Sequence, residues 1–313
     1  MRVLATASPA GVRETRRWSE RLAVHGVIWR RAIDWIILHV ASWLHSPLIF
    51  ISALFFFFKA APARKAVVQN LKTVLPGSSS FANQLRAFRT FYNFGWMLTD
   101  AAVHRLLRSP FSYELEGENF LRELAESKGA IVLTAHMGNY DLGAAIFAEK
   151  FQRQIRMVRA PEPDAGAAQH VDLALAQSSA GAVKVEYSSA GMALSFDLLA
   201  ALRKGEIISI QGDRVVGDVA RAAVPIFGRD VALPRGPFVL SYAAETPIYP
   251  LFIVRSSFRK YKIIARQPIV ARHGEGGRDA QIESAMRQWS SVLEETIRRY
   301  WPQWYAFTPM VTD

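Results

Sequence analysis

Residues 130–141 read AIVLTAHMGNYD, and this stretch decides the fold. Its first six residues form an uncharged, largely apolar run typical of a buried strand that ends at Ala135. A turn containing Gly138 follows, and Asn139 is a favourable N-cap for a helix that begins at Tyr140. The stretch therefore predicts a strand, a turn and a helix, with His136 on the turn and Asp141 in the first helical turn.

The rest of the chain from residue 112 repeats this alternation of short apolar runs and amphipathic stretches. It predicts an α/β fold with a largely parallel central sheet flanked by helices, in which ligands collect at the carboxyl ends of the strands. The expected strands are 130–135, 155–159, 183–187, 207–211, 248–254 and 261–265. The expected helices are 81–107, 140–150, 164–177, 193–203, 237–244 and 281–300.

Composition narrows the classes of function. The 313 residues are 50% hydrophobic, which is enough for a sizeable core, and carry a net charge of +11, which favours an anionic partner. Cysteine is absent, which excludes disulfides, a thiol nucleophile and cysteine-ligated metal. No cluster of metal ligands is evident, so no metal is expected.

Residues 35–58 contain no Asp, Glu, Lys or Arg and, as a helix, would span roughly 36 Å, enough for the hydrocarbon core of a bilayer. Pro47 would kink this helix near its middle. We therefore expect three parts: a basic N-terminal segment (1–34), a membrane anchor (35–58) and the α/β domain (59–313). Because both flanks are basic, an interfacial anchor fits as well as a full crossing, and a buried core helix is the alternative.

The pair His136 and Asp141 predicts general-base chemistry. A carboxylate near a helix N-terminus stays ionised, and when bonded to one imidazole nitrogen it leaves the other free to take a proton. Acyl transfer to an alcohol needs such a base near the attacking hydroxyl and needs no serine or cysteine nucleophile. The alternative is that His136 only caps a turn or closes a core hydrogen bond.

This string resembles the His-x4-Asp signature of the lysophospholipid acyltransferase superfamily and, in detail, the lipid A biosynthesis late acyltransferase family. That family includes lauroyl and myristoyl transferases and phosphatidylinositol mannoside acyltransferases. Further stretches similar to the family are 64–71, 211–214, 227–228, 234–237 and 246–250.

The resemblance implies His136 as general base and Asp141 as the residue that orients it. It also implies an acyl thioester of acyl carrier protein or coenzyme A as co-substrate, with no other cofactor. The acceptor would be a lipid hydroxyl held by basic residues beside the membrane. The expected location is the cytoplasmic face of the bacterial inner membrane.

Four further residues are candidates for substrate binding: Arg159, Asp213, Arg214 and Gly236. Arg159 ends a predicted strand and could meet a phosphate or a developing oxyanion, or simply be solvated. Asp213 and Arg214 follow another strand and could bind acceptor hydroxyls or phosphate, or pair with each other. Gly236 precedes Pro237 and shapes a helix start, which could also receive a phosphate.

Two rival classes stay open. A lipid hydrolase or thioesterase would use the same dyad on water, although no Gly-x-Ser-x-Gly elbow is present. A non-enzymatic protein that binds anionic lipid would use only the charge and the anchor. A nucleic acid partner is not expected, because the anchor favours lipid and no nucleic-acid-binding signature is evident.

Overall fold

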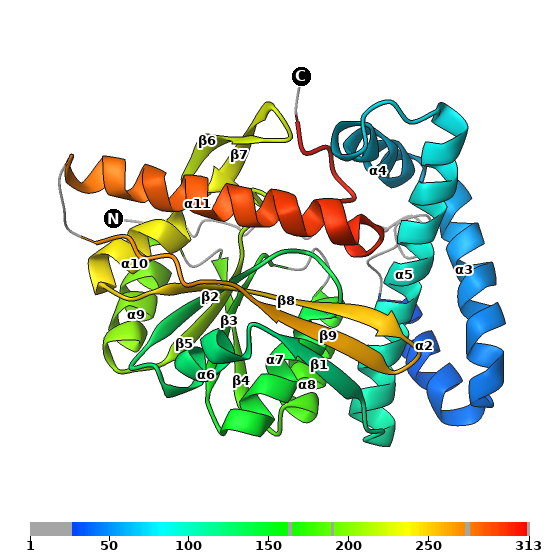
Figure 1. The fold of residues 1–313 in the computed structure, drawn as a ribbon. Helices are drawn as coiled ribbons and strands as arrows, with labels where there is room; N and C mark the ends of the chain where they lie inside the picture. Colours follow the sequence, from blue (N-terminus) through cyan, green and yellow to red (C-terminus); the bar gives the residue numbers. More distant parts are fainter. Residues whose placement is uncertain (1–26, 162–164, 189–190, 273–275, 312–313) are drawn as a thin grey trace, which may run out of the picture.

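The structure is a computed structural model that describes residues 27–161, 165–188, 191–272 and 276–311. Its centre is a seven-stranded sheet in the order β1-β9-β8-β2-β5-β3-β4 (Figure 1). All neighbouring strands are parallel except β8 and β9. The strands are β1 (Ser112–Glu116), β2 (Ala130–Thr134), β3 (Ile155–Arg159), β4 (Val183–Tyr187), β5 (Ile207–Gln211), β8 (Ile248–Ser257) and β9 (Lys260–Ala265).

Helices cover both faces of this sheet, which confirms the predicted α/β class. Ile131 and Leu133 of β2 pack with α9 (Gly191–Arg203), α10 (Gly236–Ala244) and α11 (Gly277–Tyr300). Ala130 and Val132 pack on the other face with α6 (Glu118–Glu126), α7 (Tyr140–Phe151) and α8 (Ala165–Ser178). Because successive strand residues point to opposite faces, a strand covered on both sides must be apolar throughout.

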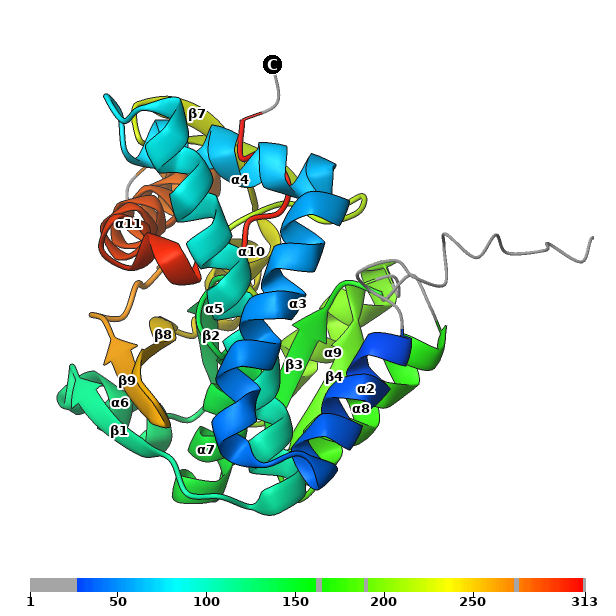
Figure 2. The ribbon, with the colours of Figure 1, turned by 90° about the vertical axis from the view of Figure 1, so that its right-hand side faces the viewer.

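The N-terminal helices form a separate group beside the sheet (Figure 2). They are α2 (Val27–His39), α3 (His45–Lys59), α4 (Ala61–Val74) and the long α5 (Ser80–Leu107). Two short 3-10 helices are also present: Ser42–Leu44 precedes α3, and Trp301–Gln303 follows α11. Of the expected basic segment 1–34, residues 1–26 lie outside the described part.

The apolar stretch 35–58 is divided between α2 and α3, so the kink expected at Pro47 is wrong, while the role of this stretch as a membrane anchor stays a prediction. The break falls at residues 40–44, before Pro47, which lies in the first turn of α3. Proline is tolerated there because the first amide groups of a helix have no intrahelical partner. By length and composition, Ser42–Lys59 could cross a membrane, and 22% of that stretch is buried.

The predicted strands and helices all correspond to observed elements, with ends shifted by a few residues. The sequence prediction omitted β1, the helices α4 and α6, and the hairpin of β6 (Arg221–Ile226) and β7 (Arg229–Pro234), which lies outside the main sheet. Phe227 and Gly228 form the turn of this hairpin, both with positive φ. Residues in this short paired segment alternate in burial but lack the continuous apolar run that marks a central strand.

Candidate active site

The carboxyl ends of β2 and β5 place His136 beside Asp213. The strands are parallel neighbours, and Thr134 of β2 is the register partner of Gln211 of β5. His136 lies two residues after Thr134, and Asp213 lies two residues after Gln211, so both directly follow the ends of these paired strands. An in-register parallel pair therefore joins residues that are distant in sequence at one edge of the sheet.

Asp213 holds the imidazole through one oxygen. Its Oδ1 lies 2.7 Å from Nδ1 of His136 and also accepts the backbone N–H of His136 at 3.1 Å. Its Oδ2 accepts the indole N–H of Trp304 at 3.0 Å. An ionised carboxylate can only accept, so Nδ1 carries the hydrogen and Nε2 keeps its lone pair.

Electrostatics favour an ionised aspartate and a neutral histidine. Burial lowers the pKa of His136, and Asp213 opposes this only in part. Burial by itself would raise the pKa of Asp213, but the hydrogen bonds from His136 and Trp304 and the positive charge of Arg214 together hold that pKa well below its ordinary value. The Asp213 side chain is fully buried and that of His136 is 18% exposed, so the ring reaches the surface of the site.

The structure gives the imidazole a different carboxylate from the one expected from the sequence. Asp141 lies in the first turn of α7, as predicted, and Asn139 caps that helix by accepting the N–H of Leu142 at 3.3 Å. The Asp141 carboxylate, however, accepts from Nη1 of Arg159 at 2.7 Å. The expected pairing of His136 with Asp141 is thus corrected to His136 with Asp213, because the turn directs the ring toward β5. A catalytic role for Asp141 stays a prediction.

The turn that carries His136 is held by backbone contacts. Gly138 has φ +57°, and a Cβ there would lie 1.6 Å from the carbonyl oxygen of Ile253, so only glycine fits. The N–H of Gly138 donates to the carbonyl of Gln303 at 2.8 Å, and the N–H of Tyr305 donates to the carbonyl of His136 at 2.7 Å. The C-terminal stretch after α11 therefore fixes the position of the histidine.

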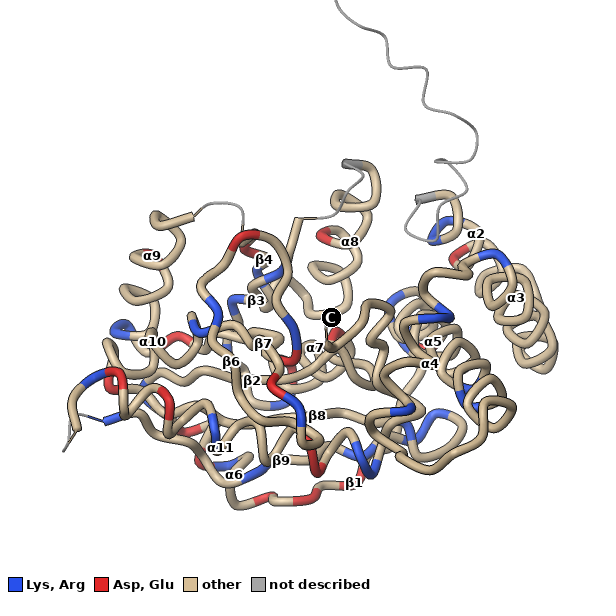
Figure 3. Tube along the Cα trace, turned by 90° about the horizontal axis from the view of Figure 1, so that it is seen from above, with Lys and Arg blue, Asp and Glu red and all other residues tan. Residues whose placement is uncertain are grey.

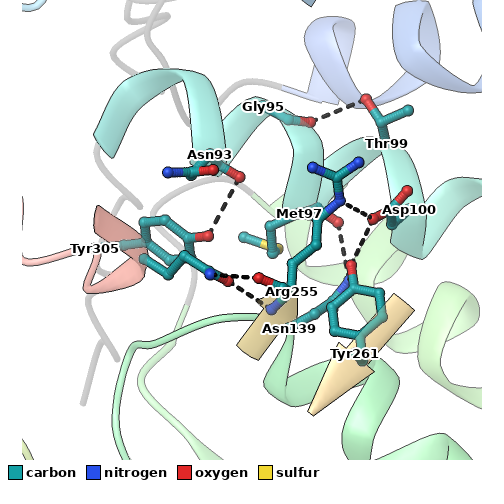
Figure 4. A network of polar contacts seen from close by, with 10 residues as sticks. Asn93, Gly95, Met97, Thr99, Asp100, Asn139, Arg255, Tyr261 and Tyr305 are labelled. Carbon is teal, nitrogen blue, oxygen red and sulfur yellow. Dashed lines mark hydrogen bonds and ion pairs between the residues drawn. The ribbon is translucent and has the colours of Figure 1, made fainter. Parts of the chain in front are cut away.

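A buried polar network ties the same turn to α5 (Figure 4). The amide of Asn139 donates to the carbonyl of Met97 at 3.1 Å and to the hydroxyl of Tyr261 at 3.4 Å. Asp100 of α5 accepts from Tyr261 at 2.6 Å and from Arg255 at 3.1 Å. Since buried polar groups are stable only when paired, this network sets how α5 sits against the turn.

A cavity of about 390 Å³ opens beside His136. Helices α5, α7 and α8 supply its apolar walls, and its size falls in the range of small-molecule sites. The apolar lining includes Met97, Leu98, Ala101, Leu142, Val171 and Leu175. A second cavity, about 50 Å³, shares Tyr140 but not His136 and is too small for a substrate.

Two of the four predicted binding residues, Arg159 and Arg214, lie at this cavity. Arg159 and Arg214 line it with His136 and Asp141. Arg214 donates to the carbonyl of Tyr305 at 3.1 Å, so Asp213 and Arg214 have different hydrogen-bond partners. Gly236 starts α10, as predicted, but is not among the residues that line the cavity.

Two functional residues escaped the sequence prediction. Neither Trp304 nor Tyr305 was among the predicted site residues, yet Trp304 donates to Asp213 and Tyr305 lines the cavity. A buried Trp N–H needs a partner, which is the only signal the sequence carried. In the described part of the chain, no group of three or more His, Asp or Glu side chains is arranged to hold a metal ion.

Fold and site together define an α/β protein with a carboxylate-held histidine at the sheet edge, facing an apolar cavity. The chain belongs to the bacterial lipid A biosynthesis acyltransferase family, whose model matches residues 15–310. This confirms the family that the sequence motifs indicated. A comparison with curated proteins found no match to the chain.

Proposed function

We propose that the protein moves a fatty acyl chain from an acyl thioester to a hydroxyl of a glycolipid or phospholipid, such as a lipid A precursor. The observation that carries this proposal is the imidazole of His136, held through Nδ1 by Asp213 in a cavity that apolar side chains of α5, α7 and α8 also line. A neutral base beside a space that suits an alkyl chain is what transfer to an alcohol requires.

In this reaction, Nε2 of His136 takes the proton of the acceptor hydroxyl while the oxygen attacks the thioester carbonyl. The imidazolium is stabilised by the Asp213 carboxylate 2.7 Å from Nδ1. The tetrahedral intermediate then collapses and breaks the carbon–sulfur bond. The thiolate leaves and takes the proton from Nε2, which yields an ester, a thiol and the starting imidazole.

Two arginines supply positive charge near the reacting atoms. Arg159, held by Asp141, and Arg214, held by the carbonyl of Tyr305, both line the cavity with His136. Each suits the developing oxyanion or a phosphate of donor or acceptor. We infer that Asp141 serves to orient Arg159, which gives the His-x4-Asp spacing a role other than holding the imidazole.

The net charge of +11 favours a donor whose acyl chain is carried by an acidic acyl carrier protein over one carried by coenzyme A, although both present the same thioester. The same positive charge is attracted to the anionic lipids of the cytoplasmic leaflet, which supports action at the cytoplasmic face of the inner membrane.

The exposed face of α3 supports attachment to a membrane surface. Ile49, Ala53 and Phe57 are buried against α5, with Ile49 close to Gly95. Large apolar side chains are exposed on α2, on the corner after it and on the outer face of α3: Trp35, Trp43, Phe50, Ile51, Leu54, Phe55 and Phe58. Figure 3 shows α3 almost free of charged residues, and Lys59 is the only one in its sequence.

We infer that α3 lies in the interface and does not cross the bilayer. It packs along α5, so a full crossing would carry α5 residues such as Arg86, Arg89 and Asp100 toward the hydrocarbon core. Each charged side chain at the bilayer centre costs about 2.5–3.5 kcal/mol. An interfacial helix places its apolar face in the acyl region and leaves α5 with the enzyme.

The activity is tested with purified protein, a labelled acyl thioester of carrier protein or of coenzyme A, and membrane lipids as acceptors. Label should move to lipid with wild-type protein and not with His136→Ala, while His39→Ala, an exposed histidine on α2, should behave as wild type. Release of free fatty acid alone would identify a hydrolase, and no turnover with any thioester would leave only a lipid-binding protein.

Attachment is tested by flotation with anionic phospholipid vesicles. Replacing Phe55 and Phe58 by serine should weaken vesicle binding about a hundredfold, since a buried Phe side chain contributes at least about 1.5 kcal/mol. The matched control is Phe196→Ser, an exposed phenylalanine on α9. Equal flotation of the double variant and the wild type would reject the interfacial role of α3.

A further inference from the structure

The ring of Tyr140 lies beside the imidazole of His136. The two rings meet edge to face, with centroids 6.2 Å apart and planes at 70°. The guanidinium of Arg159 lies over the same tyrosine ring, 5.7 Å from its centroid. Tyr140 is the first residue of α7 and therefore directly follows the Gly138 turn that carries the histidine. The turn thus fixes the tyrosine and the histidine relative to each other.

The hydroxyl of Tyr140 lies on the side of the cavity that contains His136. The Tyr140 side chain lines both that cavity and the smaller second one. Besides burial, four nearby side chains shift the pKa of its hydroxyl: Asp141, Arg159, Gln211 and Arg214. All four line the first cavity, and none lines the second. The ring therefore separates the two cavities, and its oxygen faces the one in which the base lies.

The hydroxyl keeps its hydrogen while its surroundings suit a negative oxygen. Burial, together with the negative charge of Asp141, raises the pKa of Tyr140 above its ordinary value. The positive charges of Arg159 and Arg214 act in the opposite direction and attract negative charge to the same place. A protonated hydroxyl can donate a hydrogen bond, and an oxyanion that accepts this bond is stabilised by the nearby arginines as well.

Gln211 supplies a buried donor beside this hydroxyl. It is the last residue of β5 and is the register partner of Thr134, two residues before His136. Its Nε2 atom is buried and has no hydrogen-bond partner among the described residues. Such an unpaired donor is costly, and a role in catalysis is one reason for a protein to keep it. The oxygen of Tyr140 is an acceptor close to Gln211, and once it accepts from Nε2, its own hydrogen must point elsewhere.

We propose that the hydroxyl of Tyr140 donates a hydrogen bond to the thioester oxygen during acyl transfer, and that Gln211 positions this hydroxyl. The inference rests on the proposed acyl transfer and adds one catalytic and one positioning residue to it. When the acceptor oxygen attacks, the carbonyl oxygen becomes an oxyanion and accepts the hydrogen bond. When the carbon–sulfur bond breaks, the carbonyl forms again. Tyr140 keeps its proton throughout, so His136 remains the group that moves a proton.

Tyr140→Phe tests the hydroxyl alone, because the ring that contacts His136 and Arg159 is kept. In initial rates of label transfer from thioester to lipid, kcat should fall about a hundredfold, the scale for loss of one oxyanion donor. The KM for the thioester should change by less than about twofold, since the bond strengthens only in the transition state. The matched control is Tyr113→Phe, which lines the second cavity and not the first and should keep the wild-type kcat.

A thioether analogue of the donor, with a methylene group in place of the carbonyl, reports on the shape of the site. This analogue lacks the oxygen that Tyr140 contacts, so it should inhibit the wild type and Tyr140→Phe equally well. If its affinity for Tyr140→Phe falls as far as kcat does, the hydroxyl only supports the structure of the site, and the catalytic role is overturned.

The positioning role of Gln211 is tested by combining variants. Gln211→Met keeps the approximate volume but removes the amide, and it should lower kcat about tenfold, the scale of one hydrogen bond. In the Tyr140→Phe background it should have no further effect, because Gln211 acts through the hydroxyl. Gln211→Glu introduces a carboxylate that accepts the hydroxyl hydrogen, so its kcat should be lower than that of Gln211→Met. Losses that multiply in the double variant would overturn the positioning role.

The outcomes separate this inference from the proposed function. If the wild type transfers no label to lipid, the proposed function fails and this inference fails with it. If the wild type transfers label but Tyr140→Phe keeps more than about a tenth of its kcat, this inference alone is overturned. The same conclusion holds if Tyr140→Phe changes only KM.

Discussion

Replacing Asp213 by asparagine tests which carboxylate serves His136. The side chain is fully buried and bonded to Nδ1 of His136 at 2.7 Å, so the substitution removes a negative charge from beside the forming imidazolium. Two charges about 4 Å apart interact by about 4 kcal/mol at an effective dielectric constant near 20. That energy corresponds to a fall of about a thousandfold in kcat.

The same substitution at Asp141 should have a much smaller effect. Asp141 is 26% exposed on its side chain and pairs with Arg159, so Asp141→Asn weakens the hold on a cation but leaves the imidazole and its carboxylate intact. We expect kcat to fall by about tenfold or less, the scale of one partly exposed hydrogen bond.

The assay is the initial rate of label transfer from acyl thioester to lipid, with kcat and KM separated and thermal unfolding by circular dichroism as the control for folding. The decisive comparison is the ratio of the two losses. If folded Asp213→Asn keeps more than a tenth of wild-type kcat, or if Asp141→Asn is the more damaged variant, the assignment of Asp213 to the histidine is refuted.

Three further predictions follow from the same contacts. Trp304→Phe removes the N–H that donates to Asp213 at 3.0 Å. Because a charge-assisted hydrogen bond is lost, kcat should fall about tenfold or more with little change in KM. An unchanged kcat would show that the indole only fills space. Burial lowers the pKa of His136, and the neutral ring is the base, so kcat/KM should be level at neutral pH and fall only below about 6.5; an acid limb centred above 7 would contradict this. Asp100→Asn leaves the half-buried Arg255 without its carboxylate and should lower the free energy of unfolding by about 3–5 kcal/mol in urea titrations. Asp279→Asn, in an exposed pair with Arg235, should change the free energy of unfolding by less than about 1 kcal/mol. Similar losses in both variants would argue against the buried network.

At the N-terminus, composition predicts the apolar character of residues 35–58 but not how they divide into helices or which side is buried. The absence of charge across 35–58 indicated an apolar segment, and Ser42–Lys59 keeps that property in the structure. Composition did not show the break at residues 40–44 or the stripe of Ile49, Ala53 and Phe57 that α5 covers. Which side of an evenly apolar helix is buried depends on the partner helix, here on close packing of Ile49 at Gly95.

The sequence by itself determined most of the alternation of strands and helices along the chain and the position of His136 at the end of a strand. Local signals suffice for these, because a buried run such as 130–134 and an N-cap such as Asn139 act over a few residues. Only the tertiary structure decided that Asp213 and not Asp141 holds the imidazole. The pairing of β5 with β2 in register brings Asp213 beside His136, whereas the carboxylate of Asp141 pairs with Arg159. Neither contact can be read from the spacing of residues along the chain.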